Sequence, residues 1–204
     1  GLLLGMDMFK ILKNERGFTV IELISVLAIS TILILISAVG LNAFFVKNKE
    51  LNTWVSLQKD AINCLNTMKV GIPVGGQNET SFYGVVNAEE LELTGSASAN
   101  DPAEGVICHQ PMASIMQASD RSYFYFDGQA VRVNYVYKGY SPPSPDYLFP
   151  ERGQLDEYEV LQFGIWQANP GETVELINVV LEARVKIREG YYKTLKFSTI
   201  MGKN

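Results

Sequence analysis

The chain has 204 residues, of which 47% are hydrophobic, and a net charge of −5. That length is typical of one domain with an appended segment. The acidic balance disfavours nucleic acid as the main partner, because nucleic acid favours a basic surface. Two cysteines and a single histidine are a thin basis for a zinc site, which takes three or four ligands.

An uncharged apolar run follows a short basic segment at the start of the chain. Residues 1–17 hold three basic and two acidic side chains, residues 23–46 hold none, and residues 47–204 hold fourteen basic and nineteen acidic ones. A run of this length exceeds the roughly 20 residues that span a bilayer as a helix. It is also longer than the core of a cleaved secretory signal. By the positive-inside rule, the N-terminus stays in the cytoplasm and the body is exported.

One carboxylate, Glu22, stands near the start of this apolar segment, in "RGFTVIELI". A charge in hydrocarbon is costly, so its presence needs an explanation. The stretch resembles the prepilin signature of type IV pilins and of the pseudopilins of type II secretion. The resemblance implies that a peptidase cuts after Gly17, that Phe18 becomes the N-methylated new N-terminus, and that Glu22 is the fifth residue of the mature chain.

Physical chemistry gives Glu22 a role that agrees with this resemblance. A cut after Gly17 creates a positive amine at the edge of an apolar helix. When such helices bundle, a carboxylate about one turn along a neighbouring helix neutralises that amine, and a buried charge is tolerated only when it is paired. Glu22 is therefore predicted to be an assembly contact and not a catalytic group.

Two details depart from the usual pattern of the family. Many members carry a proline about two-thirds along the apolar helix, whereas Gly40 is the only helix-weakening residue in that neighbourhood here, so a kink is not assured. Met6 and Met8 are both candidate start residues, and either would leave residues 1–5 upstream of the true start.

Residues 47–70 are predicted to continue as an amphipathic helix. Apolar side chains recur there at three- and four-residue steps and form one stripe, and Gly71, Pro73 and Gly75 then end the helix. The stripe consists of Leu51, Trp54, Leu57, Ala61, Cys64, Leu65 and Met68. Together with the anchor, this segment is expected to form one long helix. The apolar stripe on its second half must then be buried by other parts of the chain.

The rest of the chain supplies strands for that cover. Asp127-Gly128 separates two alternating aromatic-rich runs, residues 157–167 predict another strand, and Glu189-Gly190 divides a closing hairpin. Between the strands, residues 87–105 are expected to form a loop with a short helical turn and then a flexible stretch, and residues 141–153 an exposed, partly extended proline-rich loop.

In the closing hairpin, one face is apolar and the other carries Arg184, Lys186 and Arg188. This pattern fits an antiparallel sheet laid on the amphipathic helix, so we expect an α+β fold, the pilin fold. The expected parts are a leader (1–17), a transmembrane or filament-core helix (18–46) and an exported domain (47–204) with its helix (47–70) before loops and strands (71–204).

Cys64 and Cys108 leave two alternatives open. An exported domain can join such a pair in a disulfide, whereas the place of Cys64 on the apolar stripe favours a free thiol that acts as a small hydrophobe. His109 beside Cys108 suggests a Cys–His nucleophile or a metal site. Because residues adjacent in sequence rarely face each other, an ordinary loop histidine is expected.

Acidic side chains at Asp156, Glu157 and Glu159 provide the oxygen ligands that Ca²⁺ needs, and some major pseudopilins hold calcium in a C-terminal loop. The chain lacks the D-x-D-x-D-G spacing, so solvated charge is the expected state. We therefore expect no metal, no cofactor and no catalytic set.

The sequence thus predicts a structural subunit, not an enzyme, of a type IV pilus or a type II secretion-like pseudopilus. A mature chain of 187 residues and strands that resemble those of the larger minor subunits favour a minor subunit. The alternative is a binding module, either a tip adhesin or a DNA-uptake (competence) pilin. The acidic body weakens the DNA version, while the basic face of the last hairpin keeps it open.

The expected partners are prepilin peptidase, other pilin or pseudopilin subunits, the assembly platform and the cytoplasmic membrane. Before assembly the chain is expected to cross that membrane once, with its N-terminus inside. After assembly it is expected in a cell-surface pilus or an extracytoplasmic pseudopilus.

Overall fold

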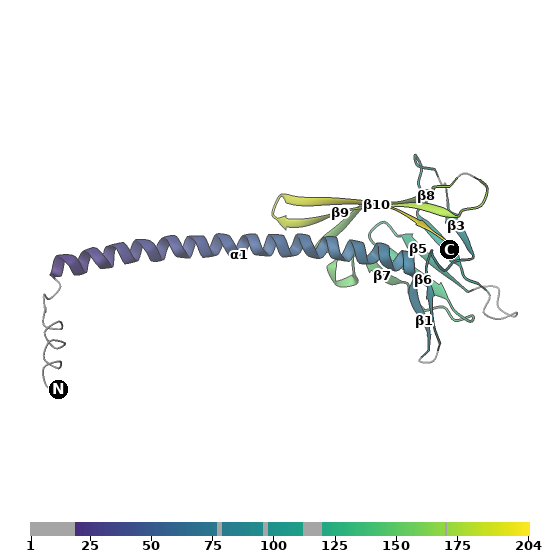
Figure 1. Cartoon of the computed structure of the whole chain (residues 1–204), viewed down its shortest axis with the longest axis horizontal. Coiled ribbons are helices and arrows are strands. Elements are labelled where there is room, and N and C mark those ends of the chain that lie inside the picture. Colours follow the sequence, from purple (N-terminus) through teal and green to yellow (C-terminus); the bar gives the residue numbers. More distant parts are fainter. Residues whose placement is uncertain (1–18, 77–78, 96–97, 112–119, 170) are drawn as a thin grey trace, which may run out of the picture. The chain divides into compact units, whose positions relative to one another are not determined.

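The computed structural model describes residues 19–76, 79–95, 98–111, 120–169 and 171–204 (Figure 1). The predicted leader and Phe18 lie outside the described residues. The chain forms two compact units, Gly1–Lys49 and Glu50–Asn204, and each is described by itself. The second holds most of the domain that the sequence predicts to be exported, and it is called the exported unit below.

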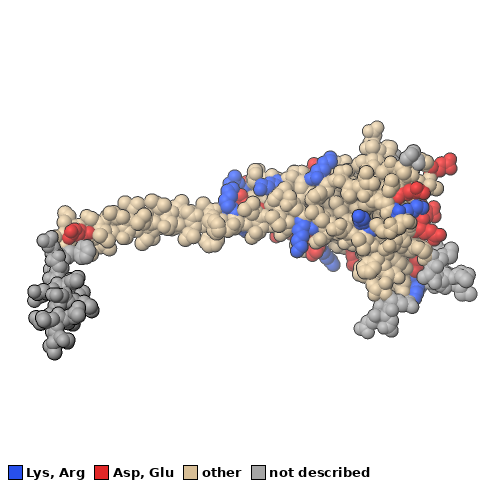
Figure 2. All heavy atoms as spheres, in the orientation of Figure 1, with Lys and Arg blue, Asp and Glu red and all other residues tan. Residues whose placement is uncertain are grey.

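Helix α1 runs from Val20 to Val70 and is apolar on all sides in its first part. Its most apolar window has a mean hydropathy of 2.6 and is not buried, and among the described residues it is the one helix long and apolar enough to cross a membrane. Figure 2 shows this stretch free of charge beyond the acidic group near its start. An all-round apolar surface suits lipid and not water.

Three hydroxyl groups in the apolar part of α1 form hydrogen bonds within the helix. Ser25, Thr31 and Ser37 each donate to the carbonyl oxygen four residues earlier, at 2.8 Å. Such internal bonds suit hydrocarbon, which supplies no partner for a polar group. The helix continues through Gly40 as one element.

The second half of α1 buries most of its predicted stripe in the core of the exported unit. Leu57, Ala61, Cys64, Leu65 and Met68 are buried. Trp54 is half-buried against the same cluster. Leu51 was wrongly placed on the buried stripe: it is 53% exposed, because the covering strands do not extend over it.

Gly71 ends α1 with a positive φ of 104°. A Cβ there would lie 2.3 Å from the backbone nitrogen of Gly84. The close approach lets the amides of Val85 and Val86 donate to the carbonyl oxygens of Met68 and Lys69, both at 3.0 Å. The returning chain thus satisfies carbonyls that a helix end leaves unpaired.

The described strands form three antiparallel sheets, of order β1-β2, β3-β4-β5-β6-β7 and β10-β9-β8. Their bounds are β1 (Ile72–Gly76), β2 (Glu79–Tyr83), β3 (Glu90–Thr94), β4 (Gly105–His109), β5 (Arg121–Phe126), β6 (Val131–Val136), β7 (Asp146–Phe149), β8 (Tyr158–Gln167), β9 (Leu176–Arg188) and β10 (Tyr191–Gly202). A 3-10 turn covers Arg152–Gln154.

This layout confirms the expected α+β, pilin-type fold, including the hairpins about Asp127-Gly128 and Glu189-Gly190. Two loop predictions were wrong. Strand β3 forms within residues 87–105, because Leu91 and Leu93 alternate with polar residues and pair with β4. Strand β7 forms within residues 141–153 and pairs with β6.

The core of the exported unit lies between the stripe of α1 and the inner faces of the strands. In β9 the odd-numbered side chains from Ile177 to Val185 are buried and Ile187 is half-buried, whereas the even-numbered ones from Glu182 onward are exposed or half-buried. The buried set comprises Ile177, Val179, Leu181, Ala183 and Val185. The predicted inward and outward faces of the closing hairpin are therefore confirmed.

Candidate functional site

Glu22 lies in the first turn of α1, where it forms a capping box with Thr19. The backbone nitrogen and the hydroxyl of Thr19 donate to Oε2 of Glu22 at 2.8 and 2.9 Å, and the nitrogen of Glu22 donates to the Thr19 hydroxyl at 3.3 Å. This reciprocal arrangement satisfies amides that a helix start leaves unpaired. The T-x-x-E spacing in the sequence is the signal that could have predicted it.

The capping box uses only atoms of residues 19–22, and these all follow the predicted cut. Gly17 and Phe18 lie outside the described residues. Glu22 is exposed, and within the described part of the chain its carboxylate accepts hydrogen bonds from Thr19 alone, both at Oε2.

Cys64 on α1 and Cys108 on β4 are free thiols buried in one hydrophobic cluster. Burial raises the pKa of each thiol to about 12. Each therefore acts as a small core hydrophobe, which is the alternative to the disulfide that the sequence left open.

We expect both thiols to resist modification in the folded protein. Only the thiolate is nucleophilic, and a pKa near 12 in place of 9 lowers the thiolate fraction at neutral pH about a thousandfold. A thiol reagent should thus leave both residues unmodified in the folded protein. It should modify both once the protein is denatured, even though no reductant is added. If the denatured chain showed no free thiol, the disulfide alternative would hold instead.

His109 is not in a loop, as the sequence suggested, but on strand β4, next to Cys108 and on the opposite face. Its Nε2 lies 3.1 Å from Oε2 of Glu92 on the neighbouring strand β3. Because Cys108 is buried and His109 points away from it, the two form no nucleophile–base pair. In the described part of the chain, no three His, Cys, Asp or Glu side chains are grouped to hold a metal ion.

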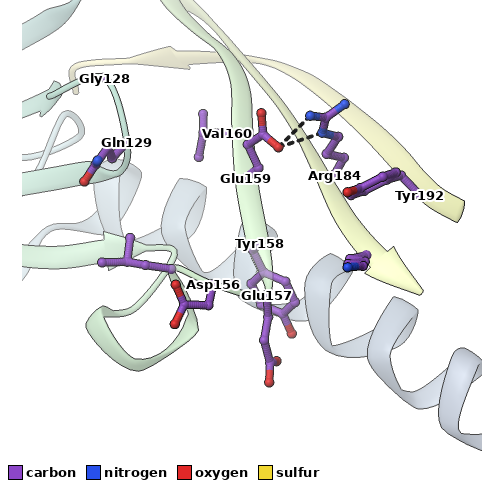
Figure 3. A pocket seen from close by; sticks show the side chains of 11 residues that line it. Gly128, Gln129, Asp156, Glu157, Tyr158, Glu159, Val160, Arg184 and Tyr192 are labelled. Carbon is purple, nitrogen blue, oxygen red and sulfur yellow. Dashed lines mark hydrogen bonds and ion pairs between the residues drawn. The ribbon is translucent and has the colours of Figure 1, made fainter. Parts of the chain in front are cut away.

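The acidic residues after β7 line a pocket of about 670 Å³ between the start of β8 and the last hairpin (Figure 3). Glu159 accepts from Nε and Nη2 of Arg184, both at 2.7 Å. Figure 3 shows the Asp156 and Glu157 side chains directed away from Glu159. The three carboxylates thus do not converge on one point, as a calcium ion would require.

The basic outer face of the last hairpin carries aromatic side chains as well. The Arg184 guanidinium lies 4.8 Å from the Tyr192 ring centre, and that of Arg188 lies 5.3 Å from the ring of Tyr191. Both distances are in the cation–π range. Sequence reasoning identified the basic residues of this face but not their stacking on the tyrosines.

A family model described as the prokaryotic N-terminal methylation motif matches residues 12–38. The match covers the predicted cut, the capping box and the first part of α1. Searches of curated proteins and of solved structures found no match to the chain. The N-terminal segment thus carries the prokaryotic N-terminal methylation motif, and the long helix followed by antiparallel sheets has the layout of the pilin fold, so the chain is similar to type IV pilin-like precursors.

Proposed function

We propose that the protein is a structural subunit, minor in its filament, of a type IV pilus or a type II secretion-like pseudopilus. The observation that carries this proposal is the methylation motif at residues 12–38, placed directly on the start of an apolar helix. A motif of this kind points to a structural protein and not to an enzyme. The size of the mature chain and its closing hairpin strands favour a minor role.

In this proposal residues 1–17 are a leader and residues 18–46 first anchor the chain in the cytoplasmic membrane and later line the filament core. Residues 47–204 are then the exported domain. The partners are prepilin peptidase, the assembly platform and other pilin or pseudopilin subunits. The alternative of a tip adhesin or DNA-uptake pilin has weaker support, because acidic side chains outnumber basic ones in the exported unit.

Maturation is the first step to test. On co-expression with a prepilin peptidase, intact mass and N-terminal sequencing should give a chain that starts at Phe18 and carries one added methyl group. Replacing Gly17 with aspartate should abolish this product, because the peptidase accepts glycine before the cut. The same substitution at Gly153, an exposed glycine outside the apolar segment where a side chain meets no other atom, is the control and should leave the N-terminus at Phe18.

An uncut chain from the native sequence would contradict the proposed cleavage site. In that case the protein would be a plain membrane-anchored domain, and Glu22 would act only as the cap of α1.

A further inference from the structure

The closing hairpin ends in a basic patch on an acidic unit. Residues 184–196, called the hairpin tip here, hold five basic side chains and one acidic one. The other residues of the exported unit hold seven basic and eighteen acidic side chains. The tip therefore has a net charge of +4 and the remainder a net charge of −11. Figure 2 shows acidic groups gathered over the end of the unit where Figure 1 labels β3.

Part of the basic charge at the tip is unpaired and open to solvent. Arg184 pairs with Glu159, and Lys196 pairs with Glu182 at 3.2 Å. Lys186 and Arg188 are exposed, and neither pairs with an acidic side chain among the residues that the structure describes.

Two tyrosines accompany these cations. Tyr191 and Tyr192 are 43% and 45% exposed. Their rings stack with Arg188 and Arg184, so each presents an apolar body beside a positive charge. Tyrosine and basic side chains are the types that concentrate at membrane surfaces, where an apolar layer meets charged headgroups.

Contacts within the exported unit set the direction in which the hairpin points. At its base, the Asn204 nitrogen donates to the Val86 carbonyl, and Val86 in turn donates to Lys69 at the end of α1. Further along, Lys193 Nζ lies 5.6 Å from the ring centre of Trp54. The hairpin thus runs back beside the helix (Figure 1), and its turn lies about 10 Å beyond Lys193 at the usual rise of a strand.

Only a short length of chain separates Trp54, which the tip contacts, from the uncharged apolar run. Trp54 follows Val46, the last residue of the uncharged run, by eight residues. Along α1 that separation is about 12 Å. Lys and Arg side chains near an anionic membrane surface are attracted to it within a Debye length of about 8 Å at physiological salt.

We propose that the hairpin tip contacts the anionic lipid headgroups of the membrane that holds the chain's own anchor before assembly. Phosphate groups of nucleic acid share the headgroup chemistry, but a long polyanion would also meet the acidic remainder of the unit. A headgroup layer meets only the basic end. The proposal depends on membrane anchoring and not on which filament the subunit joins.

The test uses the full-length chain in lipid vesicles, with a fluorophore attached through Glu189→Cys at the turn. Cys64 and Cys108 stay unlabelled because both are buried. Vesicles consist of phosphatidylglycerol or of phosphatidylcholine, each with a small fraction of lipid bearing a nitroxide headgroup, which quenches the fluorophore on contact. We expect strong quenching only in the anionic vesicles, with loss at about 1 M salt, where the Debye length falls to about 3 Å.

Two double variants distinguish an effect of the basic residues at the tip from an effect of the protein's overall charge. Lys186→Glu with Arg188→Glu should lower the equilibrium constant for contact by at least about tenfold. Arg121→Glu with Arg152→Glu changes two exposed basic residues elsewhere in the unit and should have no effect. If the double charge reversal lowers the melting temperature, Lys186→Gln with Arg188→Gln replaces it, because this variant only removes the two positive charges.

Equal quenching in neutral and anionic vesicles, or quenching that neither tip variant reduces, would overturn the proposal. Duplex DNA added to the same samples tests the other partner. Three results together would assign the tip to nucleic acid and not to the membrane. The tip would bind DNA, the tip variants would no longer bind it, and quenching would be the same in neutral and anionic vesicles.

Discussion

Glu22→Ala is expected to leave cleavage after Gly17 intact and to reduce incorporation into filaments by two orders of magnitude or more. In the proposed filament the new amine of Phe18 would need a counter-charge, and removing one partner of a buried ion pair costs about 3–5 kcal/mol. Co-expression with the peptidase and the assembly machinery, followed by separation of sheared filaments from membranes, measures both steps on the same sample.

The capping box gives Glu22 a second possible role, that of stabilising the start of α1. Two variants distinguish this role from the proposed pairing with the amine. Thr19→Ala removes the box and keeps the carboxylate, and loss of a helix cap costs only about 1 kcal/mol. Glu22→Gln keeps an oxygen that accepts from Thr19 but lacks the charge. We expect Glu22→Gln to fail in assembly and Thr19→Ala to retain most of it. The opposite ranking would assign Glu22 to the helix cap alone.

Leu57→Ala is expected to destabilise the exported unit by about 2–5 kcal/mol, the cost of removing a large apolar side chain from a packed core. Leu57 is 0% exposed and lies in the cluster that joins α1 to the strands. A chain of ordinary stability loses a large share of its free energy of unfolding by such a change. Urea unfolding of the full chain in detergent, followed by tyrosine and tryptophan fluorescence, gives the difference.

Leu51→Ala is the matched control for Leu57→Ala. It makes the same change on the same helix, but Leu51 is 53% exposed. Its effect should stay within about 0.5 kcal/mol, as for surface positions in general. Equal losses at the two positions would mean that the core extends further along α1 than the structure places it.

Local patterns were enough to predict most of the fold. The uncharged run and the apolar steps that follow it predict α1, because a helix repeats its faces every three to four residues. Alternation around Asp127-Gly128 and Glu189-Gly190 predicts the two hairpins, and Gly71 predicts the end of the helix. Each of these signals involves neighbours in sequence, and neighbours in sequence stay neighbours in the fold.

The missed elements depend on distant partners. The segment Glu90–Thr94 has only two leucines to mark it as a strand, and it becomes β3 by pairing with Gly105–His109. Leu51 continues the periodicity of the stripe, yet its side chain is 53% exposed. Whether a helix residue is buried depends on the strands that pack against it. The periodicity of the helix sequence does not show how far those strands extend.

For the candidate site, the sequence by itself determined the membrane-spanning helix, the position of Glu22 and the family motif, because all lie within one continuous segment. The tertiary structure decided that Cys64 and Cys108 are core thiols, and that Asp156, Glu157 and Glu159 do not converge. It also decided that the basic tip of the last hairpin lies beside Trp54. These facts depend on how strands, helix and loops pack against one another, where packing and not local propensity sets the distances.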